Sequence, residues 1–335
     1  MITNLLLEHY GLMAQSGVAM VVVENATVDY LRGSGARRSI RADTDENLDG
    51  LKRLADAIKE QGAIACLQIN HAGRFASVSE AVAPSAVETF GRMPKALTLS
   101  EIAEIQDKYV DAALRVQKAG FDMVELHGGT GYLLAQFVSP RTNKRQDEYG
   151  GSLEIRQKFA LEVVSKVKKA VGSFPVGYRF LADEWLPDGL KLEEFTLVAR
   201  SLAHAGVAYL SVMGGTYESF RLPEIVEKSS KSGYMVDLAA AVKKEVDVPV
   251  ITAGLIVTGE LAKQIIEEGK ADLIGLARVL WTDPAWPRKV IQGKDNEILR
   301  CDSCNACMKI LMKGKPAFCV RWSTEKQQSF REKLA

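Results

Sequence analysis

The stretch LKRLADAIKE at residues 51–60 is followed closely by AIACLQI at residues 63–69. The first has apolar side chains at helical spacing, and the second is a short, almost wholly apolar run. Such a run is typical of a strand that is buried on both faces, as in a parallel sheet covered by helices. We therefore expect the repeating unit of this chain to be a helix that leads into a buried strand.

The same alternation continues up to residue 290, and no linker or low-complexity tract interrupts it. We predict strands at residues 18–23, 63–69, 123–126, 176–180, 209–212, 248–251 and 273–276. Helices are predicted at residues 3–14, 51–60, 99–118, 153–171, 192–205, 236–245 and 259–268. A long series of such units favours an α/β fold of the (β/α)8 TIM-barrel type. The alternative is a doubly wound open sheet, which usually carries G-x-G-x-x-G after its first strand, and no such motif follows residues 18–23.

The strand count falls one short of a complete barrel. Seven strands are predicted, whereas the barrel has eight. The helix-like stretch at residues 3–14 comes before the first predicted strand, so we expect either that the N-terminal first strand is missing or that an eighth strand lies unrecognised elsewhere. The predicted domains are the barrel at residues 1–295 and a short cysteine-rich extension at residues 296–335.

Composition excludes several classes of function. The 335 residues include 43 basic and 42 acidic side chains, so the charge gives no reason to expect nucleic acid or an anionic membrane as partner. The longest apolar run, at residues 18–23, is too short to cross a bilayer, and no leader pattern opens the chain. Five cysteines argue against a secreted disulfide scaffold. We expect a cytoplasmic protein that acts on a small molecule.

Polar residues and glycines follow the predicted strands, where a barrel of this type places its functional groups. They are Glu24-Asn25, QINHAGR at residues 68–74, HGGTGY at residues 127–132, Arg179, Ala253-Gly254 and Ala277-Arg278. Because the strand interiors are aliphatic, this recurrence favours one site at the carboxyl ends of the strands.

In their order, these segments resemble the Old Yellow Enzyme family of flavin oxidoreductases. The similarity covers most of the chain, and its longest stretch is VELHGGTGYLLAQFVSPRTNKRQDEYGGSLEIR at residues 124–156. It is strongest to the branch that carries a C-terminal cysteine motif and includes 2,4-dienoyl-CoA reductase and trimethylamine dehydrogenase. The resemblance implies a TIM barrel that binds FMN and transfers hydride through flavin N5 to an activated C=C bond, with NAD(P)H as a candidate electron donor.

Five residues are the expected FMN ligands. Gly254, Ala277 and Arg278 follow the last two predicted strands, where a barrel commonly holds a phosphate on main-chain N–H groups. By resemblance, Arg179 contacts the flavin ring and stabilises negative charge on its reduced form, and Gln68 binds the pyrimidine edge. The alternatives are a turn at Gly254, a surface cation at Arg278 and a structural salt bridge at Arg179.

The resemblance also assigns the substrate side of the site. His127 would bind a carbonyl or comparable acceptor oxygen of the substrate, and Tyr132 would donate a proton to the substrate carbon. The alternatives are a structural histidine and a packing aromatic. Thr130 departs from the family, because many relatives have a second histidine or an asparagine there. A threonine weakens that two-donor clamp, which puts a simple enone substrate in doubt.

A cluster of cysteines lies near the C-terminus. Cys301, Cys304, Cys307 and Cys319 have the spacing C-x2-C-x2-C-x11-C, which suits one [4Fe-4S] cluster or one zinc ion. The alternative is a set of unliganded thiols. The relatives with this motif continue into further domains, so a cluster here would pass electrons to an external carrier or be structural. Cys66 lies within a predicted strand and is expected to be a core residue.

Three functions stay open on the sequence alone. The first is an FMN-dependent reductase of activated C=C bonds. The second is a flavin-dependent dehydrogenase that oxidises an amine or other C–H donor and passes electrons to the cluster. The third is a truncated, inert barrel scaffold, or one that another copy completes. Substrate, electron donor and any homo-oligomer are left undetermined.

Overall fold

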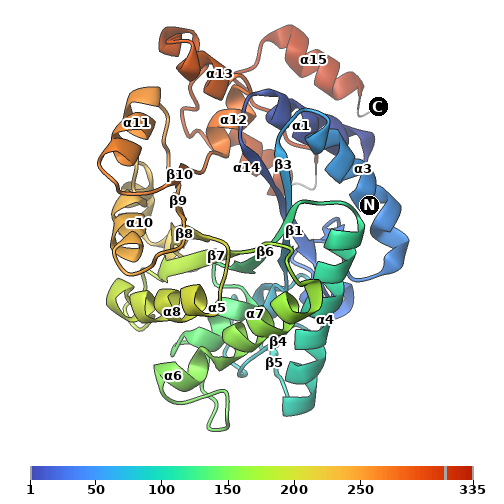
Figure 1. Ribbon diagram of the computed structural model, residues 1–335, viewed down its shortest axis with the longest axis vertical. Helices are drawn as coiled ribbons and strands as arrows, with labels where there is room; N and C mark the ends of the chain where they lie inside the picture. Colours follow the sequence, from blue (N-terminus) through green and yellow to red (C-terminus); the bar gives the residue numbers. More distant parts are fainter. Residues whose placement is uncertain (1, 313–314, 334–335) are drawn as a thin grey trace.

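The computed structural model describes residues 2–312 and 315–333 and places the strands at the centre of the molecule with helices around them (Figure 1). The main sheet has eight strands in the order β10-β9-β8-β7-β6-β3-β1-β2, and neighbouring strands are parallel throughout. Their bounds are β1 Met20–Thr27, β2 Ile40–Arg41, β3 Ile64–Asn70, β6 Met123–Gly128, β7 Val176–Asp183, β8 Leu210–Gly214, β9 Val250–Thr252 and β10 Leu273–Ile274. A second, two-stranded sheet pairs β4 Val82–Ala83 with β5 Lys95–Ala96.

The long helices cover the outside of the sheet and alternate with the strands, as predicted. They are α1 Asn4–Gln15, α3 Leu48–Lys59, α4 Leu99–Lys118, α7 Lys158–Val171, α8 Leu192–His204, α10 Val236–Lys243 and α11 Gly259–Glu267. The remaining helices are α2 Tyr30–Gly33, α5 Leu133–Val138, α6 Leu153–Arg156, α9 Pro223–Ser229, α12 Arg278–Thr282, α13 Trp286–Ile291, α14 Ala306–Met312 and α15 Thr324–Glu332.

The seven predicted strands are all present, which confirms the α/β class and the parallel sheet. The prediction of one helix over residues 153–171 was wrong, because α6 ends at Arg156 and α7 begins at Lys158. The sequence pattern also missed β2, a two-residue strand that pairs Ile40 with Ala26 and Arg41 with Thr27. A strand of this length leaves no periodic apolar signal.

The strand order has two ends in the described part of the chain, because β10 pairs only with β9 and β2 only with β1. Each of the inner strands β6, β7 and β8 is paired on both sides, and these strands hold the most deeply buried part of the sheet. The prediction that a first strand is missing stays a prediction.

The cysteine-rich segment after residue 295 packs on the barrel. Trp322 donates its indole N–H to the main-chain carbonyls of Trp281 and Thr282, at 3.2 and 3.1 Å. Lys333 pairs with Glu8 of α1, which brings the last helix beside the first (Figure 1). The boundary predicted at residue 295 is untested, but the described part of the extension is attached to the barrel at both α1 and α12.

The start of α4 shows how local chemistry sets an element's bounds. Thr98 accepts a hydrogen bond from the main-chain N–H of Glu101 at 3.2 Å, and the Glu101 carboxylate accepts from the Thr98 N–H at 2.9 Å. This capping box satisfies two donors that the first turn of a helix otherwise leaves free. Helix α4 accordingly begins and ends where its apolar pattern predicts.

Thr98→Ala should lower the free energy of unfolding by about 1 kcal/mol, because one half of the box is lost. Chemical denaturation measures the change. Ser100→Ala is the matched control, since Ser100 lies exposed in the same helix and caps nothing, and it should leave stability within about 0.5 kcal/mol of the parent. Equal stability of the two variants would contradict the assignment.

Candidate active site

Strand register brings the predicted site residues together. Gln68 of β3 is in register with Glu125 of β6, and His127 of β6 is in register with Arg179 of β7. Arg179 is in turn in register with Ser211 of β8. Residues two apart on a strand lie on the same face, so Glu125 and His127 share a face of β6. Four neighbouring strands thus carry polar groups at adjacent register positions.

Arg179 is the cation of this group. It is partly buried, and its Nη1 donates a hydrogen bond to the Ser211 hydroxyl at 2.7 Å. Burial lowers the pKa of Arg179, and the charge of Glu125 raises it. No other described residue accepts a hydrogen bond from this guanidinium, so the rest of its donors are free for a ligand. A flavin ring, which gains negative charge on reduction, is a group that such a cation stabilises.

His127 is a neutral hydrogen-bond donor. Its side chain is 6% exposed, and its Nδ1 accepts a hydrogen bond from the Gly129 N–H at 3.2 Å. The remaining nitrogen, Nε2, therefore carries the proton and can donate it to an acceptor oxygen. Burial, and secondarily the charge of Arg179, lowers the pKa of His127 to about 3. A Cβ at Gly129 would lie 2.5 Å from the Met213 sulfur, so a larger residue there would displace the Met213 side chain.

Tyr132 lies beside His127, with the two rings edge to face and their centroids 4.9 Å apart. Its hydroxyl is 2.7 Å from the hydroxyl of Tyr217, and burial raises its pKa well above the ordinary value. Tyr217 belongs to the loop after β8 and is 44% exposed, so it connects the buried phenol with solvent. Sequence reasoning missed Tyr217, because a single exposed tyrosine in a loop carries no periodic or motif signal.

Aromatic side chains cover this part of the site. Phe75 lies edge to face with both Tyr132 and Tyr217, at centroid distances of 6.5 and 5.2 Å, and stacks on Phe90 at 5.7 Å. The surroundings of the Tyr132 hydroxyl are therefore largely apolar, which suits a flat organic substrate.

Thr130 is not placed as a second donor beside His127. Its hydroxyl points to the Met213 sulfur at 3.5 Å, and its backbone is left-handed, with φ of 58°. This conformation is strained for a β-branched residue. The weakened two-donor clamp expected from Thr130 stays a prediction.

The predicted phosphate ligands lie at the ends of β9 and β10. Gly254 has φ of +108°, and an added Cβ would lie 3.0 Å from the Met235 nitrogen, so only glycine fits. Within residues 2–312 and 315–333, no group accepts from the main-chain N–H groups of Gly254, Ala277 or Arg278. Free N–H groups at the ends of two adjacent strands fit a phosphate. The Arg278 guanidinium lies 3.5 Å from the Ser303 hydroxyl, toward the cysteine segment.

The residues present therefore fit FMN. A cation without a second partner on β7, an amide on β3 and free main-chain donors after β9 and β10 are groups that this cofactor can use. Glu125, which sequence reasoning did not select, lies among them as a carboxylate that is 1% exposed. The only signal for it was one acidic residue inside an otherwise apolar strand.

All four C-terminal cysteines line one small pocket, together with Arg278 and Trp281. Burial raises the pKa of the Cys307 thiol, and the charges of Cys319, Cys301 and Cys304 raise it further. The thiols are free, and that of Cys319 lies 3.6 Å from the Thr282 hydroxyl. Among the described residues, no three histidine, cysteine or acidic side chains are close enough to hold a metal ion as they stand. Four thiols around one pocket are nevertheless the donor set that an iron–sulfur cluster uses.

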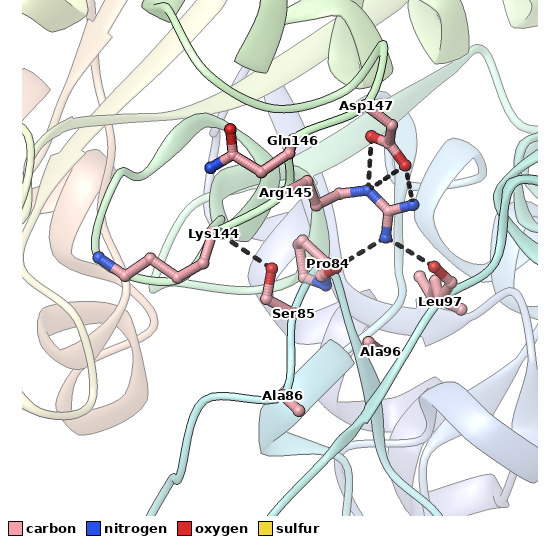
Figure 2. Close-up of a pocket in the computed structure, with 9 residues that line it drawn as sticks. All are labelled: Pro84, Ser85, Ala86, Ala96, Leu97, Lys144, Arg145, Gln146 and Asp147. Atoms are coloured by element: carbon pink, nitrogen blue, oxygen red, sulfur yellow. Dashed lines mark hydrogen bonds and ion pairs between the residues drawn. The ribbon is translucent and has the colours of Figure 1, made fainter.

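A second cavity, of about 700 Å³, lies apart from these groups and is lined by none of the predicted site residues (Figure 2). Arg145 crosses it, donates to the main-chain carbonyls of Pro84 and Leu97 at 2.8 and 2.6 Å, and pairs with Asp147. Because Arg145 holds these loops together, we assign this cavity a structural role.

An α/β barrel whose polar groups converge at the carboxyl ends of its strands is a scaffold for cofactor-dependent enzymes. The model of the NADH:flavin oxidoreductase / NADH oxidase family matches residues 1–297, and the chain belongs to this family of flavin-dependent oxidoreductases. This confirms the resemblance to the Old Yellow Enzyme family that the sequence motifs carried.

Individual relatives agree. An NADH oxidase of Thermoanaerobacter brockii is 44% identical over 313 residues, which are 91% of this chain and 48% of that protein. An NADPH dehydrogenase of Geobacillus sp. (strain WCH70) is 36% identical over 282 residues, which are 83% of this chain and 81% of that protein. This chain spans about half the length of the NADH oxidase and of a metal reductase of Desulforamulus reducens.

Two solved structures are similar over nearly the whole chain. A 2-naphthoyl-CoA reductase in complex with 2-naphthoyl-CoA has a TM-score of 0.89 at 27% identity, covering 95% of this chain and 51% of that one. Histamine dehydrogenase from Rhizobium sp. 4-9 has a TM-score of 0.87 at 28% identity, covering 94% of this chain and 47% of that one.

Among the described residues, no helix is both long and apolar enough to span a bilayer.

The low pKa of His127 has a testable consequence. A histidine whose pKa is about 3 stays neutral at every pH at which the fold is expected to persist. The rate at which the reduced enzyme reacts with its substrate should therefore show no inflection due to His127 between about pH 5 and 8. The pH profile of His127→Gln should have the same shape over this range. A stopped-flow pH profile checks this, and an inflection near pH 6.5 that disappears in the variant would show that His127 titrates normally.

Proposed function

We propose that this chain binds FMN and reduces an activated C=C bond of a small organic substrate, with NAD(P)H as the electron donor. Bound FMN would supply the hydride. Gln68, Arg179, Gly254, Ala277 and Arg278 would hold the cofactor. The names of the NADH oxidase and NADPH dehydrogenase relatives support the donor, and that of the 2-naphthoyl-CoA reductase supports a reductive direction.

The observation that carries the proposal is a neutral donor beside a buried phenol. His127 Nε2–H binds an acceptor oxygen of the substrate and draws electron density away from the double bond. Because its pKa is raised, the Tyr132 phenol stays protonated, and it delivers this proton to the substrate carbon. The hydroxyl of Tyr217, 2.7 Å away, lies between that phenol and solvent.

His127→Ala should leave FMN bound but slow substrate reduction by about 10²-fold, the scale of losing one oriented donor. Single-turnover mixing of the reduced enzyme with a panel of enoyl and enone substrates measures the rate. His204→Ala is the matched control, because His204 lies exposed at the end of α8. Unchanged reduction in His127→Ala with normal flavin content would remove His127 from the proposed mechanism.

The second candidate is the oxidative reaction, in which an amine or another C–H donor is the substrate. The similarity to histamine dehydrogenase supports it, and so does the pocket that the four cysteines line. Anaerobic screening separates the two directions: amines that bleach the oxidised flavin favour the dehydrogenase, and alkenes that reoxidise the reduced flavin favour the reductase. An inert scaffold predicts a colourless protein that does neither.

We further propose that Cys301, Cys304, Cys307 and Cys319 hold a [4Fe-4S] cluster, with a zinc ion as the alternative. Four thiols that line one small pocket are costly to gather as thiolates unless a metal neutralises them. Such a cluster would exchange electrons with an external carrier or brace the segment that packs on α12 and α1.

Anaerobically purified protein should contain about four iron and four sulfide per chain. Metal analysis and the broad absorbance beyond the flavin bands, which dithionite bleaches, measure this. Cys304→Ala should abolish that absorbance, whereas Cys66→Ala, which removes the thiol buried in β3, should retain it. One zinc per chain would make the segment structural, and no metal at all would contradict both assignments.

A further inference from the structure

Glu125 is a buried charge that the proposed reaction does not use. It is 1% exposed and lies in the middle of β6. A carboxylate in such a place costs several kcal/mol unless it is paired and hydrogen-bonded. The residues that satisfy Glu125 therefore indicate what this acidic group does.

Each carboxylate oxygen of Glu125 has one donor. Gln68 donates its side-chain N–H to Oε1 at 2.5 Å, and Tyr209 donates its hydroxyl to Oε2 at 2.8 Å. Tyr209 reaches this position because its ring packs over Gly177, where a Cβ would lie 2.2 Å from the ring. Gly177 is itself in register with Glu125, so the sheet is built to admit this contact.

The bond to Glu125 orients the amide of Gln68. An ionised carboxylate only accepts hydrogen bonds, so the nitrogen end of the amide must face it. The carbonyl end, Oε1, then points to the other side, and no described residue donates to it. The pyrimidine ring of a flavin carries an N–H donor, which needs an acceptor of this kind.

Glu125 also acts on Arg179 through its charge. Burial raises the pKa of Glu125 and lowers that of Arg179, and the opposite charge of each residue counteracts the shift in the other. Arg179 donates to Ser211 at 2.7 Å. The carboxylate thus offsets part of the positive charge that Arg179 would present to a bound flavin.

We propose that Glu125 is a positioning residue for the flavin: it holds the carbonyl oxygen of Gln68 toward the cofactor and tempers the positive charge of Arg179. This inference rests on the proposed function, because it requires that FMN lies against Gln68 and Arg179.

Glu125→Gln tests it, because the change keeps the size of the side chain, removes its charge and lets the Gln68 amide turn either way. The dissociation constant for FMN should rise by about tenfold, the effect of one misdirected hydrogen bond. The midpoint potential of the flavin should rise, because Arg179 then faces the reduced ring without compensation. The melting temperature of the apoprotein reports separately on the fold.

A double-mutant cycle separates the two effects. If Glu125 acts on affinity through Gln68, the losses in Gln68→Ala and Glu125→Gln overlap, and the double variant binds FMN about as well as Gln68→Ala alone. The rise in potential acts through Arg179 and should persist in the Gln68→Ala background. Additive losses of affinity would overturn the positioning role.

Tyr209→Phe is the matched control, because it removes the other hydrogen bond to Glu125 and keeps the charge. Its flavin potential should stay near that of the parent, and an equal rise would overturn the charge assignment.

If Glu125→Gln does not fold, Glu125→Asp keeps the charge with a shorter reach and should weaken FMN binding while the potential stays near the parent value. A parent chain that binds no FMN overturns the proposed function as well, whereas normal parent binding with unresponsive Glu125 variants overturns this inference alone.

Discussion

The register of β6 between β3 and β7 is the constraint on which the site depends. It sets Glu125 beside Gln68 and His127 beside Arg179, so two opposite charges, an amide and an imidazole meet inside one sheet. None of these groups could be buried alone at reasonable cost. A slip of β6 by one residue would turn Glu125 and His127 to the opposite face of the sheet and separate them from Gln68 and Arg179.

The charges of this group divide its chemical roles. Burial and the nearby Arg179 keep His127 neutral, so the imidazole can donate a hydrogen bond but carries no positive charge. Arg179 supplies the positive charge, and Glu125 limits it. In the proposed reaction the phenol of Tyr132 would supply the proton, and it lies among aromatic side chains next to the partly exposed Tyr217. Charge, hydrogen bonding and proton supply are thus carried by different side chains.

The sequence predicted what periodicity and local chemistry determine. Helix α4 has its predicted bounds because a capping box and a long amphipathic pattern define them together. Strand β6 extends beyond the prediction because its last residues, His127 and Gly128, end the apolar run before the strand ends. Strand β7 also continues, through Leu181 and Ala182 to Asp183, beyond the predicted end at residue 180. Strand β2 was missed because two residues have no pattern at all.

The sequence predicted site residues only where a recognisable motif contains them. The motif that begins in the last residues of β6 predicted His127 and Tyr132, and the structure brings both together. Tyr217 and Glu125 depend on contacts between strands or loops 85 and 57 residues apart in sequence, which no local pattern encodes. Arg278 was expected at a phosphate, and its guanidinium also reaches the cysteine segment, which spacing alone did not indicate.

Direct titration tests most directly whether these side chains form a binding site for one FMN. FMN added to the flavin-free chain under anaerobic conditions should lose its fluorescence until one equivalent is bound, and the end point should stay the same when the ionic strength is raised. Failure to saturate, or an end point that is not one FMN per chain, would contradict the account.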